Sequence, residues 1–264
     1  MQKGAYGFGI ARSIEPVRSR ARLGELCEML SSAVGAIFLP THVDSYRRLV
    51  DGLDGGELGV AWVPPIPCIE LEQRAPSSGL LLPVRRGSTS YNSALIALRS
   101  GPRSLSDVKG KRVAWVDPDS SAGYLVPRLH LQAGGRKLGA MFSEELMAGS
   151  HAAVLDAVES GRVDVGATYC SNKTPTWHGT GGRERPFDVL TMAGPIPNDA
   201  IVVSPRVPAE VRARVLRWLI ALELPRAREL CLDLLGAEAF RLASFSHYTP
   251  LRRLLHAAKY GPSA

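Results

Sequence analysis

The chain of 264 residues carries 32 Lys and Arg against 25 Asp and Glu, a formal net charge of +7, and 45% of its residues are hydrophobic. The basic residues are scattered and do not gather with aromatic residues in one block, which argues against a nucleic-acid-binding surface. No run of about 18 apolar residues exists that could span a membrane. The excess of positive charge is instead suited to steering a small anion toward a cleft.

Short apolar runs bounded by Gly, Pro or Ser predict strands, and apolar residues at helical spacing predict helices. The strands are expected at residues 6–10, 36–39, 58–62, 80–84, 94–98, 112–116, 163–168, 189–192 and 201–203. The helices are expected at residues 21–34, 45–53, 122–132, 152–160, 209–222, 225–235 and 249–258. Strands that alternate with helices in this way predict an α/β fold with parallel-rich sheets.

The turn at residues 117–127, Asp-Pro-Asp-Ser-Ser-Ala-Gly-Tyr-Leu-Val-Pro, is the most informative stretch. It joins the predicted strand 112–116 to the predicted helix 122–132. At such a junction the free backbone N–H groups, the helix dipole and the hydroxyls of Ser120 and Ser121 surround one point and suit an anion. The alternative is an ordinary helix N-cap, for which Ser and Asp are favoured.

Further short motifs flank this turn in a fixed order. Upstream are Tyr-Asn-Ser at 91–93 and Leu-Ser-Asp-Val-Lys-Gly-Lys at 105–111, and downstream are Gly-Ser-His at 149–151, Gly-Arg-Val-Asp-Val-Gly-Ala at 161–167 and Pro-Asn-Asp at 197–199. Near the N-terminus are Phe-Gly-Ile at 8–10 and Val-Asp-Ser-Tyr at 43–46. Together, over roughly residues 6–222, this ordered set resembles the substrate-binding proteins of phosphate/phosphonate-type ABC transporters.

The resemblance implies a periplasmic-binding-protein-like fold of type II. This is a two-lobed clamp with a two-crossing hinge, and it holds a small oxyanion such as a phosphonate or phosphate in its cleft. The hydroxyls and the histidine would contact the anion, the tyrosines would face the cleft, and the acid would meet the amino end of an aminophosphonate. The ligand-binding residues implied in this way are Ser120, Ser121, His151, Tyr91, Asp199 and Tyr46.

Each of these residues also has an ordinary structural interpretation. A histidine at a helix start is compatible with a surface position, a lone tyrosine with a core or rim position, and an aspartate in Pro-Asn-Asp with a turn. Two positions depart from the family pattern: Ala122 stands where a third hydroxyl is usual, and residues 64–67 are Pro-Pro-Ile-Pro where Gly is more common. Because a hydrogen bond to a charged group is worth ~1.5–3 kcal/mol, the first departure predicts weaker phosphonate binding or a different anion.

Two segments, at residues 83–90 and 193–197, predict the domain boundaries. Lobe I would comprise residues 1–86 plus 195–264 and lobe II residues 87–194, each large enough for its own core. A third stretch rich in turn formers, at residues 170–185, predicts a long loop that is either functional or an exposed flap.

The four cysteines, Cys27, Cys68, Cys170 and Cys231, are far apart and lack the spacing of zinc ligands. They are expected to be reduced apolar fillers, and no metal or cofactor is predicted. The N-terminus has no basic segment followed by an apolar one. This indicates a cytoplasmic chain as given, or a periplasmic or extracellular chain if a leader has been removed.

The predicted function is that of a solute-binding protein, not an enzyme, which clamps a small oxyanion for ABC transport or sensing. Its expected partners are a small anionic ligand and an ABC permease, with no nucleic acid, and the chain is expected to be a monomer. One alternative is a cytoplasmic enzyme on the same fold that acts on a small anionic metabolite, with His151 and either Cys170 or Asp199 as the reacting pair. No nucleophile motif such as Gly-x-Ser-x-Gly supports that alternative. Another is a cytoplasmic sensor that presents the clamp to a protein partner.

Overall fold

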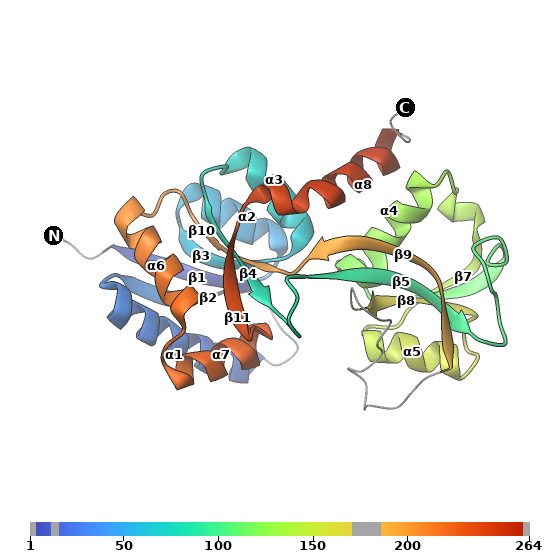
Figure 1. Cartoon of the computed structure of the whole chain (residues 1–264), viewed down its shortest axis with the longest axis horizontal. Helices are drawn as coiled ribbons and strands as arrows, with labels where there is room; N and C mark the ends of the chain where they lie inside the picture. Colours follow the sequence, from blue (N-terminus) through green and yellow to red (C-terminus); the bar gives the residue numbers. More distant parts are fainter. Residues whose placement is uncertain (1–3, 12–15, 171–185, 261–264) are drawn as a thin grey trace. The chain divides into compact units, whose positions relative to one another are not determined.

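The chain folds into two compact units in this computed structural model, which describes residues 4–11, 16–170 and 186–260 (Figure 1). Unit 1 comprises Met1–Thr89 and Pro197–Tyr248, and unit 2 comprises Ser90–Ile196 and Thr249–Ala264. The chain passes from unit 1 to unit 2 after Thr89 and returns to unit 1 after Ile196. Both positions lie within three residues of the domain boundaries predicted after residues 86 and 194. The long loop predicted at 170–185 lies, apart from Cys170, outside the described residues.

Unit 1 is built on a six-stranded sheet that joins parallel and antiparallel pairs. The parallel half brings β1 between β2 and β3, and the remaining strands continue the sheet antiparallel from β3. In spatial order the strands are β11 (Ala239–Ala243), β4 (Gly79–Val84), β10 (Ala200–Val203), β3 (Leu58–Val63), β1 (Ala5–Ala11) and β2 (Ile37–Val43).

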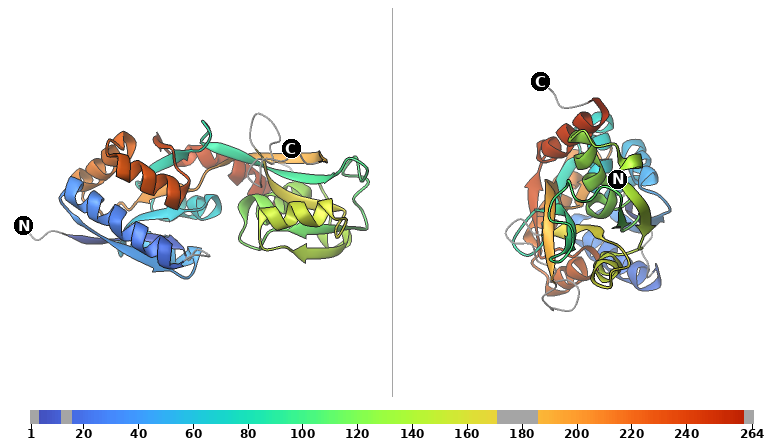
Figure 2. Two further views of the ribbon diagram at one scale, coloured as in Figure 1. Left: turned by 90° about the horizontal axis from the view of Figure 1, so that it is seen from below. Right: turned by 90° about the vertical axis from the view of Figure 1, so that its right-hand side faces the viewer.

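Helices cover both faces of this sheet, as Figures 1 and 2 show. Strand alternation separates the two cores: in β10, Ile201 and Val203 face one helical layer, whereas Ala200 and Val202 face the other. The first layer consists of α1 (Pro16–Val34), α6 (Ala209–Ala221) and α7 (Pro225–Leu235). The second consists of α2 (Tyr46–Gly55), α3 (Pro65–Arg74) and the short helix η3 (Phe245–Tyr248).

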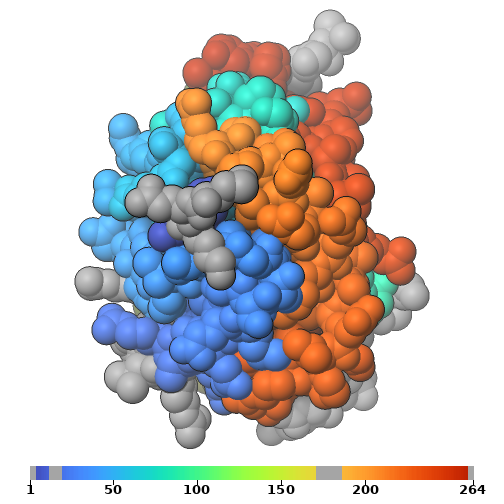
Figure 3. All heavy atoms as spheres, turned by 90° about the vertical axis from the view of Figure 1, so that its left-hand side faces the viewer, coloured from blue at the N-terminus to red at the C-terminus, as the bar shows by residue number. Residues whose placement is uncertain are grey.

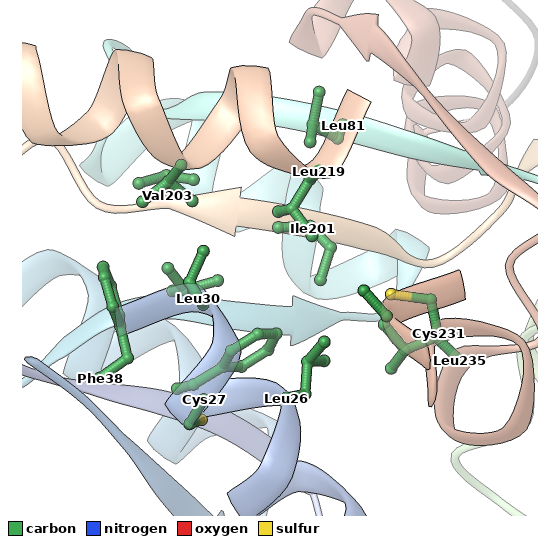
Figure 4. Packing of buried hydrophobic residues seen from close by; sticks show 14 of the residues in the cluster. Leu26, Cys27, Leu30, Phe38, Leu81, Ile201, Val203, Leu219, Cys231 and Leu235 are labelled. Atoms are coloured by element: carbon green, nitrogen blue, oxygen red, sulfur yellow. The ribbon is translucent and has the colours of Figure 1, made fainter. Parts of the chain in front are cut away.

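The larger core of unit 1 lies under α1, α6 and α7. Figure 4 shows Leu26 and Leu30 of α1, Leu219 of α6 and Leu235 of α7 packed against sheet residues such as Ile201. On the surface of the unit, α1 (blue) and the α6–α7 segment (orange) lie side by side (Figure 3). The apolar spacing that predicted these helices from the sequence is therefore the spacing that buries them.

Unit 2 is built on a five-stranded sheet in the order β7-β6-β8-β5-β9. β6 pairs in parallel with β7 and β8, and β5 runs antiparallel to β8. The strands are β5 (Ser90–Leu98), β6 (Lys111–Trp115), β7 (Phe142–Met147), β8 (Val165–Cys170) and β9 (Phe187–Pro197). One face packs on α5 (His151–Glu159), and the other on η1 (Ser121–Leu125), α4 (Val126–Ala133) and η2 (Leu138–Ala140).

The C-terminal helix α8 (Thr249–Tyr260) corrects the predicted domain assignment. The sequence placed residues 249–264 in lobe I, but α8 packs against α4 and belongs to unit 2. Its apolar residues Leu251 and Leu254 line a groove of about 350 Å³ together with Val126 of α4 and Ile196 of β9. A helix with one apolar side is placed by the surface that covers this side, and periodicity alone does not identify that surface.

All four cysteines are free and buried. Burial raises the pKa of the thiols of Cys27, Cys68 and Cys231 to about 12 and that of Cys170 to about 11. Their burial without a disulfide is what the interpretation as small apolar fillers predicts. None of the helices in the described ranges combines the length and the apolar character that crossing a membrane requires.

Candidate functional site

The carboxyl ends of the parallel strands β6, β7 and β8 lie at one edge of the sheet of unit 2. The register also brings the start of β5 to this edge, because Asn92 pairs with Cys170 at the end of β8. Anion sites in open α/β sheets form beyond such strand ends, where helix N-termini meet. Four of the six predicted site residues, Ser120, Ser121, His151 and Tyr91, lie at this edge.

Ser120 caps the helical segment that starts at Ser121. Its Oγ accepts a hydrogen bond of 3.1 Å from the Gly123 N–H. The N-cap interpretation is therefore correct for this residue. A hydroxyl that accepts through a lone pair keeps its own proton, so Ser120 remains able to donate a hydrogen bond to an anion. Capping and anion binding are compatible functions of the same side chain.

The segment after the cap begins as a π-helical turn, and Pro127 explains why. The N–H groups of Leu125 and Val126 bond five residues back, to Ser120 and Ser121. Proline has no N–H, and its ring displaces the carbonyl four residues before it, which is that of Gly123. That carbonyl instead accepts from the Val116 N–H at 3.1 Å, and this ties the turn to the end of β6.

The wider π turn leaves donors at its start. The N–H groups of Ser121 and Ala122 have no backbone acceptor within the described ranges, as expected for the first residues of a helix. Ser121 Oγ likewise has no hydrogen-bond partner in this part of the chain and is half-exposed. A Cβ at Gly123 would collide with the Val116 side chain, so only glycine allows this close approach. π turns of this kind are frequent at functional sites.

His151 begins α5 and lies beside this turn. Ser150 caps α5 through a hydrogen bond from the Ala153 N–H, and the Gly149 N–H donates to the Val116 carbonyl at 2.8 Å. The second bond joins the Gly-Ser-His loop directly to the strand that leads into the serine turn. The two helix N-termini therefore lie at neighbouring strand ends, and their dipoles both favour negative charge.

The imidazole of His151 is held on both sides. Its Nδ1 lies 3.0 Å from Thr168 Oγ1 of β8, and its ring meets the Tyr169 ring edge-on with centroids 4.9 Å apart. Burial lowers the pKa of His151 to about 4, with a smaller opposing effect from Asp117. The side chain is therefore neutral at physiological pH and can offer one N–H to an anion.

Tyr91 lies near the start of β5. It shares a strand face with Ser93, two residues on, which donates a 2.8 Å hydrogen bond to the Ala122 carbonyl of η1. The side chain of Tyr91 therefore lies on the sheet face that η1 and α4 cover. β5 begins at Ser90, four residues before the predicted start, so Tyr91 belongs to a strand and not to a loop.

The other two predicted residues, Tyr46 and Asp199, belong to unit 1. Tyr46 begins α2, after the N-cap Ser45, and packs against the core of α2 and α3. Asp199 precedes β10, and its Oδ2 lies 3.6 Å from Nη2 of Arg85. Burial raises the pKa of Asp199, while the Arg85 charge opposes this rise.

Cys170, a reacting group in the enzyme alternative, does not have the properties of a nucleophile. The Cys170 thiol is buried, its pKa is raised to about 11, and its Sγ donates to the Met192 sulfur at 3.5 Å. A nucleophilic cysteine needs a lowered pKa and access to substrate. Within the described ranges, no group of three or more His, Cys, Asp or Glu is placed to hold a metal ion.

Three supporting residues were not identified from the sequence: Thr168 behind His151, Ser93 behind the serine turn and Arg85 beside Asp199. Thr168 and Ser93 are the more informative, because both are polar side chains only 1% exposed. Each stands in an apolar strand, and this is a weak signal for a buried hydrogen bond. The pairing of Arg85 with Asp199, 114 positions apart by their numbers, has no local signal at all.

Comparison with known proteins gives concordant results. The family model described as "ABC transporter, phosphonate, periplasmic substrate-binding protein" matches residues 8–248. The Phosphonates-binding periplasmic protein of Escherichia coli is 24% identical over 263 residues, covering 96% of this chain and 76% of that protein.

Two solved structures have the same fold. XAC2383 from Xanthomonas citri, bound to chloride ion, has a TM-score of 0.76 and 21% identity, with 97% of each chain covered. PhnD1 from Prochlorococcus marinus, in complex with methylphosphonate, has a TM-score of 0.68 and 16% identity, covering 97% of this chain and 98% of that one. The type II two-lobed α/β fold expected from the sequence is therefore confirmed.

Proposed function

Since this chain belongs to the phosphonate-binding family of periplasmic substrate-binding proteins of ABC transporters, we propose that it binds a small phosphonate-like oxyanion and delivers it to a membrane permease. Its homologues are substrate-binding proteins and not enzymes. The observation that carries the proposal is the edge of unit 2, where Ser120, Ser121 and His151 lie at two neighbouring helix N-termini and Tyr91 lies near the start of β5.

The proposed binding chemistry uses neutral donors. Ser120 and Ser121 supply two hydroxyls, the first turn of the helix supplies the N–H groups of Ser121 and Ala122, and His151 supplies one ring N–H. Each hydrogen bond to a charged group contributes more than one between neutral groups, ~1.5–3 kcal/mol. Several such bonds hold an oxyanion without a cation in the site.

Isothermal titration calorimetry tests the proposal. Methylphosphonate, phosphate, sulfate and acetate are titrated into the wild-type chain and into the Ser121→Ala variant. We expect a phosphorus oxyanion to bind, and we expect Ser121→Ala to lower the affinity for it by roughly tenfold or more. Ser143→Ala on β7 is the control, because Ser143 is exposed and distant in the sheet from the serine turn. Absence of heat with all four anions contradicts the proposed ligand class.

Tyr46 and Asp199 stay predictions that rest on the family resemblance. Tyr46→Phe and Asp199→Asn separate their contributions in the same titrations. If Asp199 contacts the cationic end of a ligand, Asp199→Asn lowers the affinity for 2-aminoethylphosphonate more than the affinity for methylphosphonate. An equal effect on both ligands assigns Asp199 to the structure of unit 1, where Arg85 already faces its carboxylate.

The proposal also concerns location and assembly. We place the working protein in the periplasm, the compartment of its family, and as a monomer that docks on a permease. Fractionation of the native host with an antibody tests the compartment, and size-exclusion chromatography with light scattering tests the monomer. Recovery in the cytoplasm would favour the sensor alternative.

A further inference from the structure

The contact between His151 and Thr168 specifies more than the position of the imidazole ring. Thr168 lies in β8 and is only 1% exposed, and its Oγ1 lies 3.0 Å from Nδ1 of His151. This is the one hydrogen bond of the Thr168 hydroxyl within the described ranges. Either atom can be the donor, and the choice fixes which ring nitrogen of His151 carries the proton.

Hydrogen-bond satisfaction distinguishes the two arrangements. If Nδ1–H donated to Thr168 Oγ1, the buried hydroxyl proton would have no acceptor in the described part of the chain, which is costly. If the hydroxyl donates to Nδ1, its proton is satisfied and only acceptor capacity stays unused. The second arrangement leaves the proton of the neutral ring on Nε2, on the side of the ring away from Thr168.

We propose that Thr168 is a positioning residue that holds His151 in the Nε2–H tautomer, so that the ring presents a donor to the bound anion. This inference rests on the proposed function for the same site. With the opposite tautomer, Nε2 would present a lone pair to a negative oxygen, which repels it. The Thr168 hydroxyl thus determines whether His151 contributes an attraction or a repulsion.

The surroundings of the ring support a fixed neutral donor. Tyr169 meets the ring edge-on, which limits its rotation, and Ser150 fixes the start of α5 through its cap. Asp117 is the charged group that acts on His151 from the neighbouring turn, and its effect is smaller than that of burial. The ring therefore keeps a single proton through the neutral pH range.

A second histidine–threonine pair in unit 2 provides a matched control. His130 Nε2 of α4 lies 3.0 Å from Thr191 Oγ1 of β9. The chemistry and the distance match those of the His151 pair, but this pair is not part of the proposed anion site. Thr191→Val removes the same kind of bond from the same unit and should leave anion affinity unchanged.

The experiment combines tautomer detection with affinity. Long-range 1H–15N NMR spectra of the ¹⁵N-labelled chain at neutral pH report the tautomer of each histidine, and His151→Gln assigns its signals. We expect Nε2–H for His151 in the wild type, retention in Thr168→Ser, and a mixed or reversed tautomer in Thr168→Val. Calorimetry with methylphosphonate should show a loss of about three- to tenfold for Thr168→Val and less than twofold for Thr168→Ser and Thr191→Val.

The outcomes separate this inference from the proposed function. An Nδ1–H tautomer in the wild type overturns the inference whatever the affinity, and so does unchanged affinity in a folded Thr168→Val variant. If no anion binds the wild type, the proposed function fails, while the tautomer spectra still decide what Thr168 does. If Thr168→Val does not fold, the wild-type and Thr168→Ser spectra provide the decisive comparison.

Discussion

The Ser93 hydroxyl donates a 2.8 Å hydrogen bond to the carbonyl oxygen of Ala122, and this bond fastens β5 to the turn that carries the proposed anion site. The Ala122 carbonyl depends on it. In a regular α-helix its donor would be the Val126 N–H, which bonds to Ser121 instead, and the next N–H position is occupied by Pro127. A side chain from a neighbouring strand thus completes a helix that its own sequence interrupts.

Replacing Ser93 with Ala should destabilise unit 2. The buried Ala122 carbonyl then loses its partner, which costs about 1–3 kcal/mol of unfolding free energy. Urea denaturation followed by circular dichroism measures this loss, with the exposed Ser143→Ala as the control. Equal midpoints for both variants would show that the bond contributes nothing.

The two serines of the turn should separate stability from binding. Ser120→Ala removes the N-cap bond to Gly123 and should cost ~0.5–2 kcal/mol of stability. Ser121 Oγ has no hydrogen-bond partner among the described residues. Ser121→Ala should therefore leave the ligand-free protein as stable as wild type but weaken its binding of the anion. Thermal unfolding with and without methylphosphonate measures both effects. A large loss of stability in ligand-free Ser121→Ala contradicts this division.

His151 should make stability depend on pH below neutrality. Its pKa falls from about 6.5 in the unfolded chain to about 4 in the fold, because burial disfavours the charged ring. Between these values the unfolded state binds more protons, so stability is complete above pH 6.5 and is lost as the pH falls toward 4.

The loss attributable to His151 should be on the order of 2 kcal/mol. Urea denaturation at pH 7.5 and at pH 4.5 measures it as the difference between wild type and His151→Gln. The variant should be less sensitive to acid, and the comparison cancels the contributions of the other histidines. Parallel pH profiles would mean that His151 is as solvated in the fold as in the unfolded chain.

Arg85→Gln should destabilise unit 1 more at pH 7.5 than at pH 4. Burial raises the pKa of Asp199, and Arg85 opposes the rise, so removing Arg85 raises that pKa further. A carboxyl with a raised pKa costs stability when ionised, and this cost disappears as the pH falls through the folded and unfolded values.

At pH 7.5 the expected loss for Arg85→Gln is about 1–3 kcal/mol. Part of this loss does not depend on pH, since Arg85 also donates to the Leu235 carbonyl at 2.8 Å. Arg99→Gln is the control, because the Arg99–Asp188 pair is exposed and 3.8 Å apart. The same loss at both pH values would show that the charge of Asp199 is irrelevant.

Ala122→Ser should have opposite effects on the free and the bound protein. Ala122 is 3% exposed, so a hydroxyl there is buried and costs about 1–3 kcal/mol without a partner. If a phosphorus oxyanion is the ligand, the added hydroxyl donates to it and tightens binding. Denaturation and calorimetry on one preparation measure both effects, and weaker binding would show that the third hydroxyl position does not face the anion.

The fold was predictable where the sequence carries a regular apolar pattern. All nine expected strands and seven expected helices correspond to elements of the structure, with shifted ends. Besides the short helices η2 and η3, the structure contains one helix and two strands that were not expected: α3, β7 and β11. For α3, no helix was expected at residues 65–74, although proline favours the first helical turn and the apolar spacing of Cys68 and Leu71 follows Pro65.

The edge strands β7 and β11 were missed for a different reason. β7 has the sequence Phe-Ser-Glu-Glu-Leu-Met and no clean alternation, because in the described part of the chain it pairs with β6 alone and is largely exposed. Among the residues that the structure describes, β11 likewise pairs with one strand, β4. A strand of this kind is fixed by its partner, and the partner is not visible in the local sequence.

The sequence identified the candidate residues that would contact the anion, but not the residues that support them. Ser120, Ser121 and His151 lie at strand-to-helix junctions, and such junctions follow from local sequence. Thr168 and Ser93 act across the sheet, at separations that only the register determines. The π turn was not foreseen either, since it depends on how Pro127 and Gly123 are accommodated together.

The four buried thiols have a practical consequence for measuring ligands. Thiol-reactive dyes attack the thiolate, and pKa values of about 11 or 12 leave almost none at neutral pH. A single cysteine introduced on the surface beside the serine turn, for example at the exposed Asp119, would therefore react with a maleimide fluorophore ahead of all the native thiols. The unmodified background of this chain is thus already suited to building a fluorescent reporter of its anion.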